Sequence, residues 1–131
     1  MNHDTACHVF DTYAARLTAG DVEGVLALYA QHASLTDPAG SPARTSRNQI
    51  REAYRTATAS KLTMTRTGPV RAATDTAAAP IRITIPRDDD QDVTIDVIDV
   101  FTFDQNGLIT AMTAYWGPGN VQPPDAALPG M

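Results

Sequence analysis

The stretch Val93-Thr94-Ile95-Asp96-Val97-Ile98-Asp99-Val100-Phe101-Thr102-Phe103 decides the fold of this chain. Read at the period of two that a β-strand imposes, one face is apolar with a single exception, Asp99. The opposite face mixes polar and apolar side chains. The pattern therefore predicts a strand with one buried face and a carboxyl group that points into it. Because a buried carboxylate without a partner is costly, we expect Asp99 to be protonated, paired or functional.

The size and composition of the chain already limit the classes of function that it could have. The chain has 131 residues, is 43% hydrophobic and 19% charged, and carries a net charge of −5. These values predict one globular domain and argue against nucleic acid or an anionic membrane as the partner. Cys7 is the only cysteine, which excludes an intrachain disulfide and a thiolate zinc site. No membrane-spanning or signal-peptide pattern is present, so we expect a cytoplasmic protein.

Outside this strand, the chain divides into a helical and a strand-rich part. Apolar spacings of three and four predict a helix over 4–19 and a second one after an Asp21 N-cap, with Tyr29 on its apolar face. A capping box at Ser46 opens a third helix after a loop over 38–45. The alternation then changes to strands from residue 61 onward, which indicates an α+β fold with an antiparallel sheet.

A hairpin connects the decisive strand to the last one. Asn106-Gly107 supplies the positive φ angles of a tight turn, and we expect the last strand over 108–116. Its even-numbered residues then flank Asp99, namely Met112, Ala114 and Trp116. Residues 118–131 are rich in Pro and Gly and are predicted to form an irregular tail.

Besides Asp99, two residues could carry chemistry, and each has a simpler structural explanation. Asp37 shares a strand face with Leu35, but an aspartate before proline often caps a turn. Tyr13 lies on the apolar stripe of the first helix, where a core tyrosine with its hydroxyl at the surface is common. For Asp99 the alternative is a buried ion pair with Arg82 or Arg71, or a wrong face assignment.

Several stretches together make the chain similar to a known family. They include Tyr13-Ala14-Ala15-Arg16-Leu17, Thr36-Asp37-Pro38-Ala39-Gly40, Gly68-Pro69-Val70-Arg71-Ala72 and Asp96-Val97-Ile98-Asp99-Val100-Phe101. Over roughly residues 9–117 the chain resembles the bacterial Δ5-3-ketosteroid isomerases of the nuclear-transport-factor-2-like (NTF2-like, SnoaL-like) superfamily. The resemblance implies a single domain over 1–117, with three N-terminal helices packed on a curved antiparallel sheet as a cone around an apolar pocket. It also implies a homodimer.

The same resemblance assigns roles to individual residues. Asp37 matches the general base of the family, while Tyr13 and Asp99 match its oxyanion hole. Tyr29 and Tyr54 match tyrosines that hydrogen-bond to the oxyanion-hole tyrosine in some members. The expected substrate is a small apolar ketone, such as a 3-oxo-Δ5 steroid, with no metal or organic cofactor. Candidates for the wall around it are Met64, Val97, Phe101, Met112 and Trp116, although simple core packing explains Val97 and Phe101 equally well.

Two other functions remain open from the sequence. Asp37 and Asp99 could be the acid pair of an epoxide hydrolase or an epoxide-opening cyclase on the same scaffold. The chain could also be a non-catalytic module that binds hydrophobic ligands, because fold alone does not determine function. Ala53 stands where characterised relatives usually carry Phe close to the base, which predicts a wider pocket than theirs.

Overall fold

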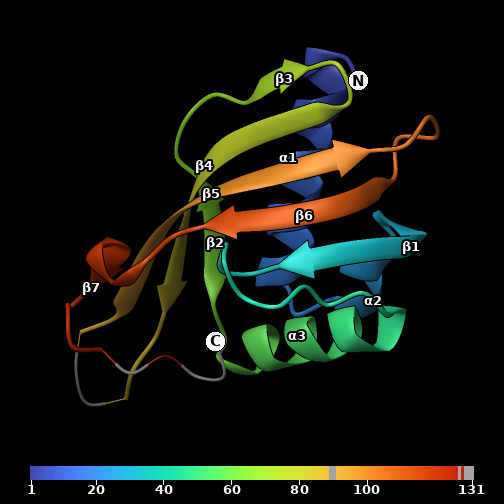
Figure 1. Cartoon of the computed structure of the whole chain (residues 1–131). Coiled ribbons are helices and arrows are strands. Elements are labelled where there is room, and N and C mark those ends of the chain that lie inside the picture. The colour runs from blue at the N-terminus through green and yellow to red at the C-terminus, as the bar shows by residue number, and fades with distance from the viewer. Residues whose placement is uncertain (89–90, 127, 129–131) are drawn as a thin grey trace.

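The computed structural model describes residues 1–88, 91–126 and 128 and shows an α+β fold in which helices cover one face of a curved sheet (Figure 1). Three helices belong to the N-terminal half: α1 (His3–Thr18), α2 (Val22–Leu26) and α3 (Arg47–Ala59). The strands are β1 (Tyr29–Thr36), β2 (Thr63–Arg66), β3 (Arg71–Ala73), β4 (Thr76–Ile85), β5 (Val93–Phe103), β6 (Ile109–Tyr115) and β7 (Val121–Gln122), with a 3₁₀ turn at Pro118–Asn120.

The sheet has the order β1-β6-β5-β4-β2, with β3 paired to β4 and β7 to β5. Every pairing is antiparallel except that of β1 with β6, which is parallel. The expected antiparallel sheet is therefore found from β6 through β2, and the parallel edge was not predicted. No hairpin forces the direction of β1, because α3 and four strands separate it from β6 in the chain.

Side-chain caps start all three helices, and those at Asp21 and Ser46 are the ones that the sequence predicts. Asn2 accepts from the backbone N–H of Thr5 at 2.8 Å, and Asp21 accepts from that of Gly24 at 2.9 Å. Ser46 and Gln49 form the expected capping box of α3. Each cap satisfies a backbone donor that the first turn leaves without a partner. The helix after Asp21 is shorter than predicted, and Tyr29 belongs to β1 instead.

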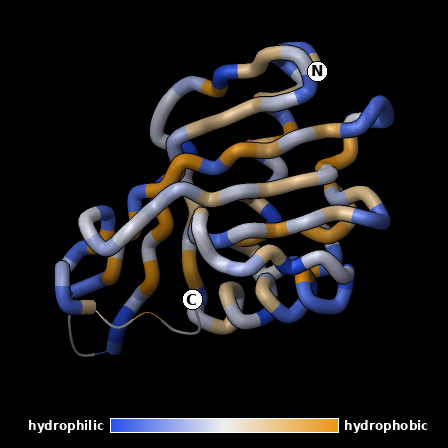
Figure 2. Tube along the Cα trace, in the orientation of Figure 1, coloured by the Kyte–Doolittle hydropathy of each residue, from blue (hydrophilic) through white to orange (hydrophobic). Residues whose placement is uncertain are grey.

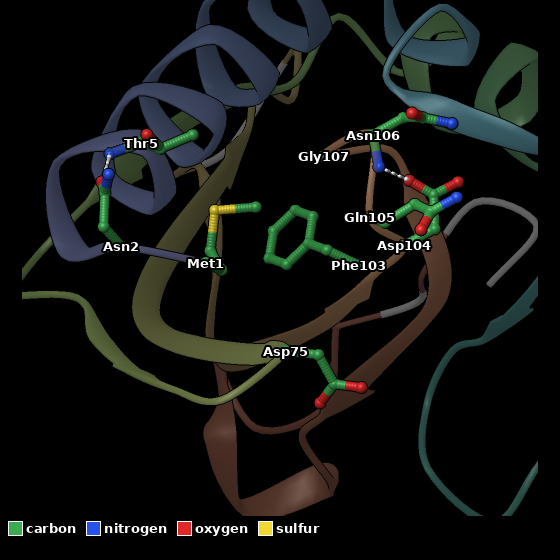
Figure 3. Close-up of a pocket in the computed structure, with 9 residues that line it drawn as sticks. All are labelled: Met1, Asn2, Thr5, Asp75, Phe103, Asp104, Gln105, Asn106 and Gly107. Atoms are coloured by element: carbon green, nitrogen blue, oxygen red, sulfur yellow. Dashed lines mark hydrogen bonds between the residues drawn. The ribbon is translucent and has the colours of Figure 1, made fainter.

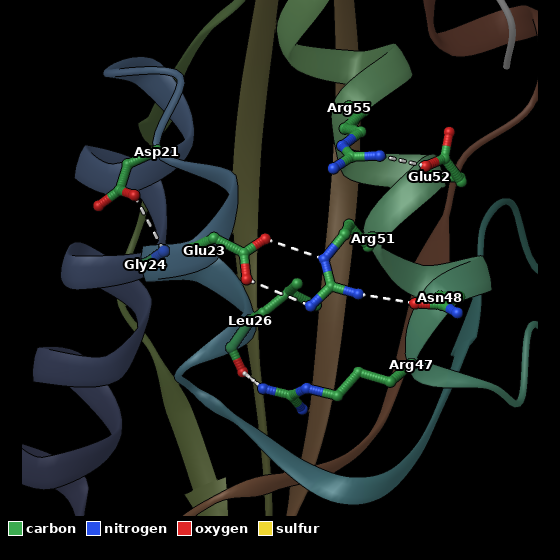
Figure 4. Close-up of polar contacts among 9 residues, drawn as sticks. All are labelled: Asp21, Glu23, Gly24, Leu26, Arg47, Asn48, Arg51, Glu52 and Arg55. Carbon is green, nitrogen blue, oxygen red and sulfur yellow. Dashed lines mark hydrogen bonds and ion pairs between the residues drawn. The ribbon is translucent and has the colours of Figure 1, made fainter.

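Polar contacts fasten α2 to α3 (Figure 4). The guanidinium of Arg51 donates to both carboxylate oxygens of Glu23, at 2.9 and 3.2 Å, and to Asn48 at 2.8 Å. Arg47 donates to the backbone carbonyl of Leu26 at 2.9 Å. Exposed ion pairs contribute little stability, so these contacts mainly orient α3. Burial of its apolar face against the core supplies most of the packing energy.

The strand that decides the fold alternates as predicted. Burial along β5 follows the odd-numbered residues, and Asp99 is one of the buried ones. Figure 2 shows apolar segments along the strands and a hydrophilic turn between β5 and β6. That turn over 104–107 is the predicted hairpin, closed by Gly107 N–H donating to the Asp104 carbonyl at 3.0 Å. In the described part of the chain, no helix is both long and apolar enough to cross a membrane.

The segment after residue 117 is more regular than predicted. Its first residues form the 3₁₀ turn and then β7, in which Ile95 pairs with Val121 and Thr94 with Gln122. Val121 is buried, so the prediction of an irregular tail is wrong over 118–122. A strand of two residues is too short to show the alternation by which strands are predicted from sequence. Residues 127 and 129–131 of the predicted tail lie outside the described residues, as do 89 and 90 between β4 and β5.

Candidate active site

A cavity lies between the inner face of the sheet and helices α1 and α3. The space between its walls is about 420 Å³ when the open solvent at the mouth is included. Four of its lining residues carry polar groups that could act on a ligand: Tyr13, Asp37, Tyr54 and Asp99. The others are largely apolar: Leu17, Ala57, Leu62, Met64, Ile83, Ile95, Val97, Met112, Ala114 and Trp116. The cavity therefore suits an apolar molecule with few polar atoms.

Asp99 is the buried acid of this cavity. Its side chain is 2% exposed, and its Oδ2 has no hydrogen-bond partner among the described residues. Burial, and secondarily the nearby Asp37 carboxylate, raise the pKa of Asp99 to about 8. The proposed ion pair with Arg82 is not formed, because Arg82 instead donates to Asp96 at 2.8 and 3.0 Å on the outer face. Asp99 is thus a carboxylic acid at neutral pH, with a proton to donate.

Three buried tyrosines stand beside this acid. The hydroxyl of Tyr54 lies 3.0 Å from that of Tyr13 and 2.5 Å from that of Tyr29. Burial raises the pKa of all three well above the usual phenol value, and the Asp99 carboxyl adds to the shift of Tyr13. The simpler expectation that the Tyr13 hydroxyl reaches the surface is wrong, since the residue is buried. Tyr13 therefore remains a protonated phenol, held in place by its neighbours.

The register of the sheet places Asp37 in the same cavity. Thr36 pairs with Thr113 in β6, so Asp37 is level with Ala114, and Ala114 pairs with Asp99 in β5. With strands about 4.8 Å apart, the two aspartates are separated by one intervening strand. The backbone N–H of Ala39 donates to the Ala114 carbonyl at 2.7 Å and closes this edge.

Asp37 combines exposure with an altered acidity. The residue is exposed by surface area, yet enough protein surrounds its carboxyl for burial to raise the pKa. A hydrogen bond from Trp116 Nε1, at 2.8 Å, and the charge of Arg44 both act in the opposite direction. Asp37 is thus an accessible carboxylate at the mouth, in contrast to the enclosed Asp99.

Four of the five predicted wall residues line the cavity: Met64, Val97, Met112 and Trp116. Phe101 does not, and the core interpretation of it is correct. Its ring stacks on Phe10 with centroids 4.5 Å apart and meets the ring of Tyr13 edge-on at 5.1 Å. It therefore supports Tyr13 from behind. Ala53 packs against the core and is likewise not a lining residue, so the space expected from it does not adjoin the cavity.

Sequence reasoning missed several lining residues although signals for them existed. Ile95 lies on the same face of β5 as Asp99. Ile83, in β4, is the cross-strand partner of Ile95. Leu17 follows Tyr13 by one helical turn, on the same stripe of α1. Ala57 follows Tyr54 in α3 but, as a small residue, gives almost no hydrophobic signal. The hydrogen bond from Trp116 was also missed, because the sequence does not reveal the β1–β6 register.

A second, more open cleft lies between the N-terminus and the β5–β6 turn (Figure 3). Asp75 and Asp104 are the acids among its lining residues, and Asp104 accepts from the backbone N–H groups of Asn106 and Leu108, at 2.8 and 3.0 Å. The Asp104 carboxylate therefore stabilises the β5–β6 turn. In the part of the chain that the structure describes, no group of three His, Cys, Asp or Glu side chains is placed to hold a metal ion.

Comparison with known proteins agrees with this geometry. The model of the SnoaL-like domain family matches residues 10–112. The chain belongs to this family. A curated relative, the steroid Delta-isomerase of Nocardioides simplex, is 38% identical over 109 residues, which cover 83% of this chain and 87% of the relative. A solved structure titled as an epoxide hydrolase/cyclase-like enzyme in pyran ring formation in the polyether salinomycin superposes with a TM-score of 0.80. It is 24% identical, over 87% of this chain and 92% of that one.

The two relatives differ in what they show for this SnoaL-like chain. The isomerase relative supports isomerase activity, and a small hydrophobic ligand accords with the apolar lining. The structural neighbour is too distant in sequence to indicate more than a shared fold. That fold is the NTF2-like cone expected from the sequence.

Proposed function

We propose that this protein moves the β,γ double bond of a 3-oxo-Δ5 steroid, or of a similar unsaturated ketone, into conjugation. The observation that carries the proposal is the pair of unlike aspartates in one cavity. Asp99 is enclosed and protonated, whereas Asp37 is accessible and accepts a hydrogen bond from Trp116. Acid and base chemistry in one site requires such a difference in environment.

The reaction begins with removal of a proton from the carbon between the carbonyl and the double bond. Asp37 accepts this proton, and the electrons of the broken C–H bond form a dienolate. Negative charge then develops on the ketone oxygen. The Tyr13 hydroxyl and the Asp99 carboxylic acid donate hydrogen bonds to that oxygen, which stabilises the charge where little water competes. Asp37 finally returns the proton to the far carbon of the dienolate.

The tyrosine network and the cavity wall support this chemistry. Tyr54 and Tyr29 fix the Tyr13 hydroxyl, so the donor is oriented before the charge forms. The apolar lining gives the fused rings of a steroid a dry surface to contact. No step requires a metal ion or an organic cofactor.

The test is an ultraviolet assay with 5-androstene-3,17-dione, comparing wild type with Asp37→Asn. We expect a conjugated enone from wild type and a rate lower by about a hundred- to ten-thousandfold in the variant, as for loss of a general base. Asp96→Asn, on the outer face of the Asp99 strand, is the matched control and should retain full activity. Equal turnover by wild type and Asp37→Asn would refute the role of the base. Opening of epoxides without enone formation would favour the epoxide hydrolase or cyclase, and ligand binding without chemistry would favour a binding module.

We further propose that the protein is a cytoplasmic homodimer whose outer sheet faces pack together. Ile98 and Tyr115 are cross-strand partners on that face and are 43% and 52% exposed. Among the described residues they are the large hydrophobic side chains that remain exposed, and their adjacency on one face supports an interface there. Analytical ultracentrifugation should give a dimer for wild type and a monomer for Tyr115→Glu, and a monomeric wild type would contradict the dimer.

A further inference from the structure

Arg44 closes the loop that begins at Asp37. The backbone N–H of Leu35 donates to the Arg44 carbonyl at 2.9 Å, and the N–H of Arg44 donates to the Leu35 carbonyl at 2.8 Å. Inside the loop, the N–H of Ser41 donates to the Pro38 carbonyl at 3.0 Å. These bonds fix the backbone of Arg44 against the strand residue that lies two positions before Asp37.

This bridge places the two charged residues on one side of the local ladder. Leu35 pairs with Met112 in β6, which lines the same cavity as Asp37, so Leu35 and Asp37 lie on the same side of the sheet. Cross-strand partners also share a side, so Arg44 and Leu35 project together. Asp37 and Arg44 therefore lie diagonally across this bridge, and the guanidinium is close enough to lower the pKa of the Asp37 carboxyl.

The charge of Arg44 is not used elsewhere among the described residues. Its guanidinium is exposed and has no carboxylate within 4.0 Å and no hydrogen-bond partner there. By contrast, Arg51 and Arg55 on the following helix are paired with Glu23 and Glu52. Because no carboxylate neutralises it, this positive charge remains available to act on Asp37, whose pKa it lowers.

The other groups that face Asp37 do not supply a positive charge. Trp116 donates a neutral N–H bond, Tyr13 and Tyr29 are phenols with strongly raised pKa values, and Asp99 is protonated. Burial of the Asp37 carboxyl raises its pKa, and the charge of Arg44 lowers it. Arg44 therefore supplies the full positive charge that opposes the effect of burial on the pKa of Asp37.

We propose that Arg44 is a positioning residue that keeps Asp37 ionised as the base in the pH range where the enzyme works. The inference rests on the proposed role of Asp37 in isomerisation. A carboxylate that is more readily ionised is also a weaker base. Arg44 therefore extends activity to lower pH at the cost of some intrinsic basicity of Asp37.

The test compares the pH dependence of kcat/KM for wild type, Arg44→Gln and Arg44→Lys. Below the wild-type midpoint, Arg44→Gln should have a kcat/KM lower by about threefold, because a larger share of Asp37 is protonated. Above the midpoint it should equal or exceed wild type. Arg44→Lys should restore the wild-type profile. Arg71→Gln removes an exposed, similarly unpaired arginine from β3 and should leave the profile unchanged.

A second measurement separates this inference from the proposed reaction. The Asp37 carboxyl is titrated by carbon-13 NMR in the free protein, with Asp37→Asn used to assign its signal. Arg44→Gln should move the titration to higher pH whether or not the protein turns over a steroid. Raising the salt concentration should move wild type in the same direction and the variant much less, because salt screens an exposed charge. Identical titration of wild type and Arg44→Gln, or an equal shift in Arg71→Gln, would overturn the role of Arg44.

Discussion

The indole Nε1 of Trp116 donates a hydrogen bond of 2.8 Å to Oδ1 of Asp37, across 79 positions of sequence. This bond connects the end of β6 to the loop after β1 and orients the carboxylate at the cavity mouth. It also favours the charged form of Asp37, because a hydrogen bond donated to a carboxylate is lost when that oxygen is protonated. Trp116 thus has two functions, as an apolar wall and as a donor.

Trp116→Phe should separate these two functions. The phenyl ring keeps most of the apolar surface but removes the donor, so the pKa of Asp37 should rise. The acidic limb of the kcat/KM profile should then move to higher pH, with a small change in KM. Steady-state kinetics over a pH series measures both quantities. An increase in KM with an unmoved acidic limb would show that the indole acts only as a wall.

Asp99 makes stability depend on pH in a direction opposite to that of most acids. Its pKa is raised from 3.8 to about 8 on folding, so the folded state binds more protons than the unfolded state between these values. The free energy of unfolding of wild type, relative to Asp99→Asn, should therefore fall by about 1.4 kcal/mol per pH unit across this window. Urea unfolding of both proteins at several pH values checks this. A difference that is constant with pH would mean that Asp99 is already ionised when buried.

Predictions from the sequence succeeded where short-range pattern determines structure. The alternation around Asp99 predicts the buried face of β5, and the expected neighbours Met112 and Ala114 are correct. The turn alone does not fix their register, because the β5–β6 ladder shifts between Thr102 and Phe103. Tyr29 was misplaced because its spacing from Val22, Val25 and Leu26 continues a helical stripe. The helix ends at Leu26, and the chain then extends to pair with β6. Such a change depends on a partner that is distant in sequence.

The cavity wall shows the same limit. Phe101 and Val97 occupy the same face of one strand, and no local feature separates them. Phe10 of α1 covers Phe101, while Val97 is left beside open space. The position of α1 over the sheet decides this difference, and it follows from packing of the whole core. The roles of Tyr13, Asp37 and Asp99 came from the resemblance to a family and stay predictions.

Tyr54→Phe should weaken the support of Tyr13, the proposed oxyanion donor, while retaining the ring. The variant loses the 3.0 Å contact with Tyr13 and the 2.5 Å contact with Tyr29. One neutral hydrogen bond contributes roughly 0.5–1.5 kcal/mol, so kcat should fall by up to about tenfold. Tyr29→Phe, which keeps the Tyr13–Tyr54 contact, should have the smaller effect. Steady-state assays of enone formation measure kcat for both variants. Equal kcat values for Tyr54→Phe and wild type would show that the tyrosine network does not contribute to catalysis.

Phe101 and Met64 form a pair of variants that tests which residues are wall and which are core. Phe101→Leu leaves a void between Phe10 and Tyr13, so the free energy of unfolding should fall by about 1–3 kcal/mol. KM should change little, because the ring is shielded from the cavity. Met64→Ala removes an apolar surface that lines the cavity and should instead raise KM by up to about tenfold, since a few buried methylenes contribute ~1 kcal/mol or more. Urea unfolding and saturation kinetics on both variants give the comparison. An equal rise in KM for Phe101→Leu and Met64→Ala would show that Phe101 is a residue of the cavity wall.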